Sequence, residues 1–72
     1  MLRVFDQCKV RDFEFAILVD DEEKTAFEAV WSEETQDWET DFSYEVLGVD
    51  SFDVAGMMDF DEVQGQGYRF ED

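Results

Sequence analysis

The chain has 72 residues, with 21 acidic and five basic side chains, no histidine and one cysteine, and its formal net charge at pH 7 is −16. This size predicts one small domain over residues 1–72, and without histidine neither a Ser-His-Asp nor a Cys-His catalytic group can form. One cysteine and no histidine also exclude an ordinary zinc site. Leu, Ile, Val and Phe account for 20 of the 72 residues, above the level of about 20% below which a highly charged chain is expected to be disordered, so we expect a folded protein.

The N-terminal part of the chain has two apolar stretches. Residues 2–5, LRVF, predict a short strand, either separate or an extension of the next one. Residues 8–19, CKVRDFEFAILV, predict a strand because every second side chain from Phe13 to Val19 is apolar. Leu18 makes the opposite face apolar as well, so we expect the end of this strand to be covered on both sides.

Residues 20–35, DDEEKTAFEAVWSEET, fit two structures. As a helix, the segment would be capped by Asp20 or Asp21 and would have further acids in its first turn, where the helix dipole stabilises them. Its apolar stripe would run from Phe27 to Trp31. As a hairpin, DDEEK would be the turn, and alternate side chains of the following residues would share one face of a strand. The capping signal favours the helix.

Residues 38–46, WETDFSYEV, alternate more regularly than any other segment and predict a strand. The side chains expected in the core are Trp38, Phe42, Tyr44 and Val46. The side chains expected to face solvent include Glu39, Asp41 and Glu45, a row of carboxylates with no lysine or arginine among them.

The last third of the chain has weaker patterns. Residues 50–62 predict either one or two helical turns or an irregular acidic loop, and their large apolar side chains serve either the core or a contact with another chain; these are Phe52, Met57, Met58 and Phe60. Residues 65–70 predict a glycine-rich turn and a short final strand with Tyr68 and Phe70 inward. The predicted fold class is α+β: a small antiparallel β-sheet of about 3–4 strands with one helix packed on it.

No catalytic, cofactor-binding or metal-binding site is predicted, and we do not expect an enzyme. Asp59 and Asp61 have the spacing that starts an EF-hand loop, but Gln64 stands where that loop needs glycine. No hydrophobic run reaches the length of a membrane span, and the N-terminus lacks the apolar core of a signal peptide. A single cysteine suits a reducing compartment, so we expect the protein in the cytoplasm of a bacterial or archaeal host cell.

The charge is divided unevenly along the chain. Residues 1–11 contain three bases and one acid, whereas residues 12–72 contain 20 acids and two bases. Such a surface repels nucleic acids and anionic membranes and attracts basic proteins, so we expect neither direct nucleic-acid binding nor membrane binding. The expected partner is a basic, nucleic-acid-binding protein, and the aromatic content is also compatible with a homodimer.

One strand face alone is too sparse to imitate a nucleic acid. Carboxylates on one side of a strand recur every ~6.8 Å, whereas duplex DNA carries one charge per ~1.7 Å of its axis. The hypothesis of mimicry therefore requires the fold to gather acids from several segments on one side. The predicted partner-binding residues are Asp20, Asp21, Glu22, Glu23, Glu28, Glu33, Glu34, Asp37, Glu39, Asp41, Glu45, Asp59, Asp61 and Glu62, and Asp50 and Asp53 would extend the set.

In size and charge the chain resembles the small acidic DNA-mimic inhibitors encoded by phages and mobile elements, which include anti-restriction and anti-CRISPR proteins. The resemblance implies a non-enzymatic inhibitor that occupies the basic groove of a nucleic-acid-binding protein and excludes its DNA or RNA. An immunity protein or antitoxin that neutralises a basic nuclease or toxin is an alternative with the same acidic surface. A halophilic protein or a small acidic accessory subunit is a further alternative.

Overall fold

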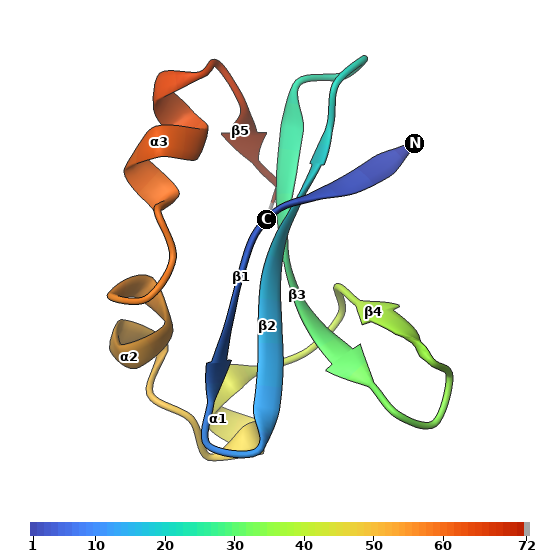
Figure 1. The fold of residues 1–72 in the computed structure, drawn as a ribbon, viewed down its shortest axis with the longest axis vertical. Coiled ribbons are helices and arrows are strands. Elements are labelled where there is room, and N and C mark those ends of the chain that lie inside the picture. Colours follow the sequence, from blue (N-terminus) through green and yellow to red (C-terminus); the bar gives the residue numbers. More distant parts are fainter. Residues whose placement is uncertain (72) are drawn as a thin grey trace.

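The computed structural model describes residues 1–71 and contains, within that range, five strands and three short helices (Figure 1). The strands are β1 (Leu2–Val10), β2 (Phe13–Asp20), β3 (Thr25–Ser32), β4 (Asp37–Glu39) and β5 (Arg69–Phe70). The helices are α1 (Tyr44–Leu47), α2 (Ser51–Ala55) and α3 (Phe60–Gly65). The expected α+β class, a small antiparallel sheet with helical structure packed on it, is confirmed.

The first four strands form an antiparallel sheet in the order β1-β2-β3-β4, and β5 joins it by pairing with β3 in parallel. The outer edge of β3 is divided between two partners. Its C-terminal half pairs with β4, with Trp31 opposite Trp38, and its first two residues pair with β5, with Thr25 opposite Arg69. The final strand predicted within residues 65–70 is therefore present, and it pairs with the outer edge of β3.

The prediction of a single strand over residues 8–19 is wrong, because the chain reverses at Arg11 and Asp12. Val10 of β1 lies opposite Phe13 of β2, so these two polar residues form a tight turn, in which Arg11 has a φ of 57°. The apolar alternation that predicted the strand is real, but it belongs to β2 alone. The expectation that the strand is covered on both sides is confirmed, since Phe15 to Val19 are all buried.

The preference for a helix over residues 20–35 is wrong, and the alternative hairpin is present. The carboxylate of Asp20 accepts hydrogen bonds from the backbone N–H groups of Glu22 at 3.0 Å and Glu23 at 3.3 Å. A turn and a helix N-terminus use the same side-chain contact, which explains why the capping signal was ambiguous. Ala26 and Ala29 are both fully buried on opposite faces of β3, an arrangement that a central strand satisfies and a surface helix does not.

The prediction of one strand over residues 38–46 is also wrong. β4 ends at Glu39, and the last part of the segment is helix α1. The ring of Tyr44 packs on Phe15, with ring centroids 5.3 Å apart, so the chain bends to bring this aromatic residue to the core. Val46, expected in the core, is 85% exposed as a result.

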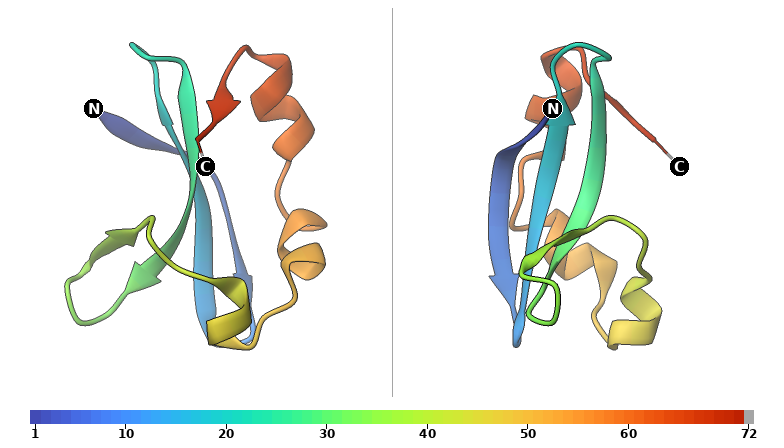
Figure 2. Two further views of the ribbon diagram at one scale, coloured as in Figure 1. Left: turned by 180° about the vertical axis from the view of Figure 1, so that it is seen from behind. Right: turned by 90° about the vertical axis from the view of Figure 1, so that its right-hand side faces the viewer.

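All three helices pack on one face of the sheet, which we call the helix face. Figure 1 shows α2 and α3 on one side of the central strands, with the β3–β4 hairpin on the other side, and Figure 2 gives two further views. The core between the helices and the sheet joins three side chains of β2 to side chains of the helical layer; its largest members are Phe15, Ile17, Val19, Val54, Met58, Val63 and Tyr68. Burial of each such side chain contributes about 1.5–3 kcal/mol, so this layer supplies most of the stability.

The region of residues 50–64 contains two short helices instead of an irregular loop. Carboxylates cap both: Asp50 accepts from the N–H of Phe52 at 2.9 Å, and Asp59 accepts from the N–H of Glu62 at 3.0 Å. Met58 is buried, whereas Phe52 is 83% exposed and projects away from the core. The apolar residues of this region therefore divide between the core and the surface.

The opposite face of the sheet, the open face, carries Ala16, Leu18 and Ala29, and no helix of the described residues packs on it. Trp38 of β4 is the large side chain that packs on these three residues. The rings of Trp31 and Trp38 meet edge to face at 75°, with centroids 5.2 Å apart, which stabilises the β3–β4 hairpin. Part of the open face consequently stays accessible.

Candidate protein-binding surface

A groove lies between the β1–β2 turn and the β3–β4 hairpin. Its volume is about 600 Å³, and its floor contains apolar side chains that include Val30, Trp31 and Phe42. We call it the acidic groove because six carboxylates line it: Asp12, Glu14, Glu33, Glu34, Glu39 and Asp41. The groove therefore combines a dense negative charge with an aromatic floor.

The strand register explains how the groove forms. Pairing between β3 and β4 places Glu39 opposite Val30 and leaves Glu33 and Glu34 in the turn between the strands. Gln36 closes this turn with a φ of 55°, and its side-chain amide donates to the carbonyl of Glu33 at 2.8 Å. The turn thus places its carboxylates at the same groove as Glu39 of β4 and Asp41 after it.

One basic side chain, Lys9, lines the acidic groove together with the six acids. Lys9 lies opposite Glu14 in the β1–β2 register, which offsets part of the charge at that end. Within residues 1–71, the one ion pair closer than 4.0 Å is Arg3–Asp21, and neither residue lines the groove. The groove carboxylates therefore present a strong, largely uncompensated negative potential to solvent.

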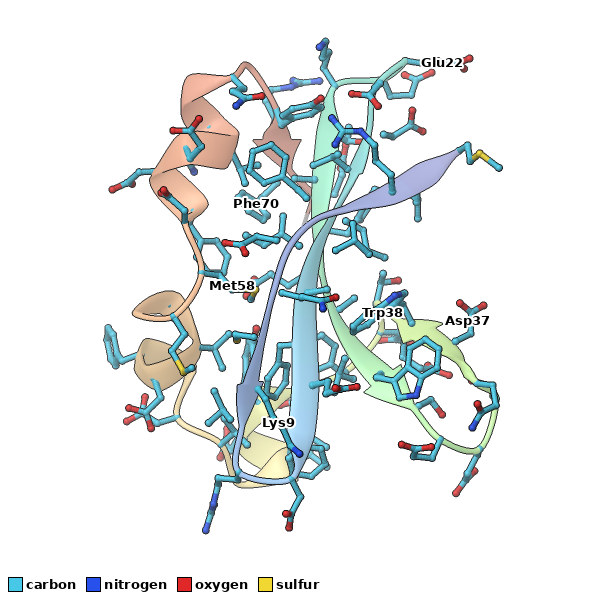
Figure 3. The ribbon with its side chains drawn as sticks, in the orientation of Figure 1. Lys9, Glu22, Asp37, Trp38, Met58 and Phe70 are labelled. Atoms are coloured by element: carbon cyan, nitrogen blue, oxygen red, sulfur yellow. The ribbon has the colours of Figure 1, made fainter. Side chains whose placement is uncertain are left out.

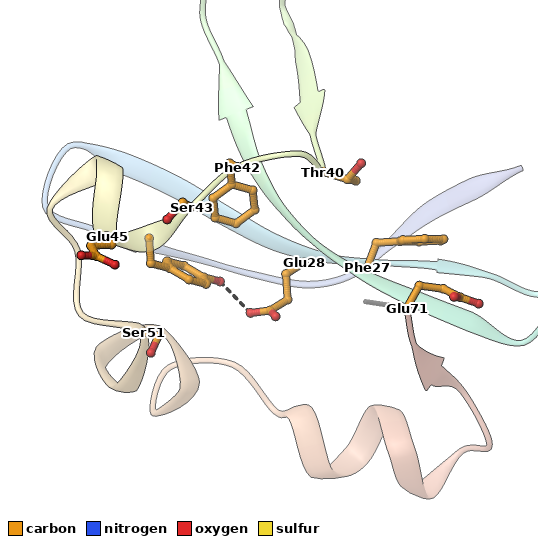
Figure 4. Close-up of a pocket in the computed structure, with 9 residues that line it drawn as sticks. Phe27, Glu28, Thr40, Phe42, Ser43, Glu45, Ser51 and Glu71 are labelled. Carbon is orange, nitrogen blue, oxygen red and sulfur yellow. Dashed lines mark hydrogen bonds between the residues drawn. The ribbon is translucent and has the colours of Figure 1, made fainter.

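A second pocket, of about 410 Å³, adjoins the acidic groove through the shared side chain of Phe42 (Figure 4). The residues that line the pocket include Glu28, Glu45 and Glu71. The hydroxyl of Tyr44 donates to Glu28 at 2.7 Å. Burial of the phenol and this bond to a carboxylate raise the pKa of Tyr44 above its ordinary value, so the hydroxyl stays a hydrogen-bond donor.

The acids of the β2–β3 turn lie at the other end of the sheet. Figure 3 shows Glu22 and Lys9 at opposite ends of the central strands, and a strand of eight residues such as β2 spans roughly 24 Å. Asp21 is bound by Arg3 and by the hydroxyl of Tyr68, and the ammonium group of Lys24 lies 4.8 Å from the centre of the Tyr68 ring. The negative charge of this turn is thus partly compensated within the protein.

The acids of α3 have structural contacts of their own. Asp59 caps the helix, and its own backbone N–H donates to the carboxylate of Asp6 at 2.9 Å. Glu62 accepts from the side-chain amide of Gln66 at 2.9 Å. These residues and Asp61 line neither the acidic groove nor the adjoining pocket.

The structure therefore brings together six of the predicted partner-binding residues and leaves the others elsewhere. Those at the acidic groove or the adjoining pocket are Glu28, Glu33, Glu34, Glu39, Asp41 and Glu45. Sequence reasoning missed Asp12, Glu14 and Glu71, which line the same two depressions. Asp12 and Glu14 could have been found by recognising the turn at Arg11 and Asp12, because a hairpin there returns both acids beside the end of β3.

Among residues 1–71 no group of three or more His, Cys, Asp or Glu side chains is arranged to hold a metal ion. The same part of the chain has no helix with the length and apolar character needed to cross a membrane.

Comparison of the chain with protein-family models, with curated proteins and with solved structures finds no match.

Proposed function

We propose that this protein is a non-enzymatic inhibitor that binds the basic groove of a nucleic-acid-binding protein and excludes its DNA or RNA. The observation that carries the proposal is the acidic groove, where six carboxylates from separate segments surround an aromatic floor. Three further carboxylates in the adjoining pocket extend the same negative region. A surface of this kind complements a groove lined by lysine and arginine.

The density of charge supports mimicry of a nucleic-acid backbone. A single strand supplies a carboxylate every ~6.8 Å on one side, far fewer than the phosphates of a duplex. The acidic groove draws on the β1–β2 turn, the β3–β4 turn and residues 39–41, so it combines carboxylates of several segments and not only those of one strand face. Convergence of several segments is what the mimicry hypothesis required.

The apolar floor supports a protein partner in place of a simple counter-ion. Lysine and arginine have aliphatic stems that pack on apolar surface while the charged head stays at a polar rim. Trp31 offers an indole on which an arginine can stack, and Glu39 and Asp41 lie at the same groove to bind its head. Long-range attraction would speed the encounter, and these contacts would slow dissociation.

The experiment compares two triple variants with the same change in charge. The groove variant carries Glu33→Gln, Glu39→Gln and Asp41→Asn, and the control carries Glu22→Gln, Glu23→Gln and Asp61→Asn. The protein is immobilised, basic proteins are captured from a cell extract, and double-stranded DNA or RNA is added as competitor. We expect nucleic acid to displace the captured partner and the groove variant to bind it roughly 10-fold more weakly, with less than about 2-fold loss for the control.

Equal losses in the two variants would mean that net charge, and not the groove, attracts the partner. A partner that nucleic acid fails to displace would contradict the inhibitory mechanism. Binding should also weaken steeply as salt is raised, because screening shortens the reach of the groove's field to about 10 Å at 0.1 M.

A further inference from the structure

A third depression lies on the open face of the sheet, outside the acidic groove. It has a volume of about 420 Å³ and is lined by Leu2, Val4, Leu18, Asp37, Trp38 and Thr40. We call it the Asp37 slot. It shares no residue with the acidic groove or with the pocket at Glu28 except Thr40, which also lines that pocket.

The walls of the Asp37 slot are apolar and accessible. Leu18 forms a nearly buried floor, while Leu2 is 46% exposed and Val4 is 42% exposed. No helix of the described residues packs on this face, so the slot keeps aliphatic surface in contact with water.

The polar part of the slot is held in place by the fold. The Oδ1 atom of Asp37 accepts a hydrogen bond from the backbone N–H of Trp38 at 2.8 Å, which restricts the carboxylate next to the β4 backbone. Figure 3 shows Asp37 and Trp38 next to each other on β4. Trp31 packs perpendicular to Trp38 and restricts its ring. The slot thus presents an aliphatic floor, an aromatic wall and one exposed carboxylate.

We propose that the Asp37 slot binds one arginine side chain of the partner. The aliphatic stem would pack on Val4 and Leu18, and the guanidinium would stack on the Trp38 indole and form hydrogen bonds with the Asp37 carboxylate. This inference rests on the proposed function, since the basic groove of a nucleic-acid-binding partner presents arginine side chains to a protein that binds it.

Other occupants fit the slot less well. A wholly apolar side chain would remove the Asp37 carboxylate from water without supplying a partner for it. A second copy of this chain carries the same net charge of −16, so two copies repel each other. Lysine carries a compact and strongly hydrated ammonium group, which lacks the planar surface that stacks on an indole.

The test uses three small peptides and the intact protein. Acetylated and amidated Gly-Arg-Gly, Gly-Lys-Gly and Gly-citrulline-Gly are titrated in low salt while the two indole N–H signals and the backbone amides are followed by NMR. We expect the arginine peptide to shift the Trp38 indole and the amides of Val4 and Leu18, with a dissociation constant on the order of millimolar. The lysine peptide should bind more weakly, and the uncharged citrulline peptide should leave these signals unchanged.

Two variants with the same loss of charge locate the site. Asp37→Asn keeps an acceptor for the backbone N–H of Trp38. It should weaken binding of the arginine peptide, followed at the Trp38 indole signal, about 5-fold to 10-fold. Asp41→Asn, in the acidic groove, should change binding at that indole by less than about 2-fold. If the two variants have equal effects, or if the shifts are confined to the acidic groove, the proposal that the Asp37 slot binds arginine is wrong. The proposed function is not affected by that result.

The proposed function can also fail alone. If the arginine peptide binds the slot as described but DNA and RNA do not displace the captured partner, the inhibitory mechanism is wrong and the arginine site remains. If arginine, lysine and citrulline peptides give the same shifts, the slot does not recognise a guanidinium and this inference is wrong.

Discussion

Arg3 of β1 binds Asp21 of the β2–β3 turn through two hydrogen bonds, from Nε to Oδ2 at 2.7 Å and from Nη2 to Oδ1 at 3.1 Å. The hydroxyl of Tyr68 accepts from the same guanidinium at 3.0 Å and donates to Asp21. Three segments that are far apart in the sequence therefore meet at this end of the sheet. One of the chain's five basic residues is used here to hold the fold together.

Asp21→Asn should lower stability in a pH-dependent manner. The guanidinium of Arg3 and the Tyr68 hydroxyl hold the pKa of Asp21 well below its ordinary value of 3.8. A depressed carboxyl pKa stabilises the folded state above the ordinary pKa, and this contribution is lost as the pH falls through the folded-state pKa. Urea unfolding should show that the free energy of unfolding of the wild type exceeds that of the variant by a constant amount from pH 7 to 5. This difference should shrink below about pH 4.

The exposed acid Asp53 provides the comparison for Asp21, since no hydrogen bond to its carboxylate is present among the described residues. Asp53→Asn should not reproduce the dependence on pH seen for Asp21→Asn. If the free energy of unfolding of Asp21→Asn differs from that of the wild type by the same amount at pH 3 as at pH 7, the charge of the Arg3–Asp21 pair contributes nothing to stability.

Gly48→Ala should destabilise the protein by about 1 kcal/mol. Gly48 ends helix α1 with a φ of 73°, a left-handed conformation in which a Cβ atom is strained. Gly65→Ala is the matched control, because Gly65 is the last residue of α3 and an added Cβ there meets no atom within 4 Å. The control should be neutral or should stabilise by up to about 1 kcal/mol, and equal effects of the two substitutions in chemical denaturation would contradict the assigned turn.

Val63→Ala should cost about 2 kcal/mol, because it removes two methyl groups from a fully buried position between α3 and β2. Phe52→Ser removes a much larger apolar side chain, but one that is 83% exposed, so its effect should stay within about 0.5 kcal/mol. Urea unfolding of the two variants compares these values. A larger loss for Phe52→Ser would place that ring in contact with the core or with a second chain.

Glu39→Gln combined with Asp41→Asn should leave the fold intact and raise its stability. Both carboxylates lie in the acidic groove among other acids, so neutralising them removes repulsion. Added sodium chloride should raise the melting temperature of the wild type more than that of the variant, and each 1 kcal/mol gained corresponds to about 4–8 °C. A variant less stable than the wild type at low salt would mean that these carboxylates make stabilising contacts.

The elements that sequence reasoning predicted well are those whose pattern arises from local chemistry. Every second residue from Phe13 to Val19 is apolar, as expected of a strand with one face on the core, and Phe15 to Val19 are buried. The glycine-rich turn before β5 and the inward position of Tyr68 were predicted for the same reason. Errors arose where one local signal serves two structures, as with Asp20, whose carboxylate caps a turn with the same bond that would cap a helix.

Residues 38–46 show what only the tertiary structure decided. Their alternation predicted one strand, and the outward position of Glu39, Asp41 and Glu45 is confirmed. The chain leaves the sheet after Glu39, however, because packing of Tyr44 on Phe15 outweighs the preference of an alternating segment for a strand.

Composition and charge by themselves determined that this protein presents an acidic surface and that it has no histidine for a Ser-His-Asp or Cys-His group. Which acids lie together was decided by the tertiary structure alone. The turn at Arg11 and Asp12 and the register between β3 and β4 bring separate segments to one groove, and they leave the β2–β3 turn at the other end of the sheet. The physical reason is that like charges repel and so cannot gather themselves in one place. Apolar packing and strand pairing set the position of the backbone, and the backbone position determines where the carboxylates lie.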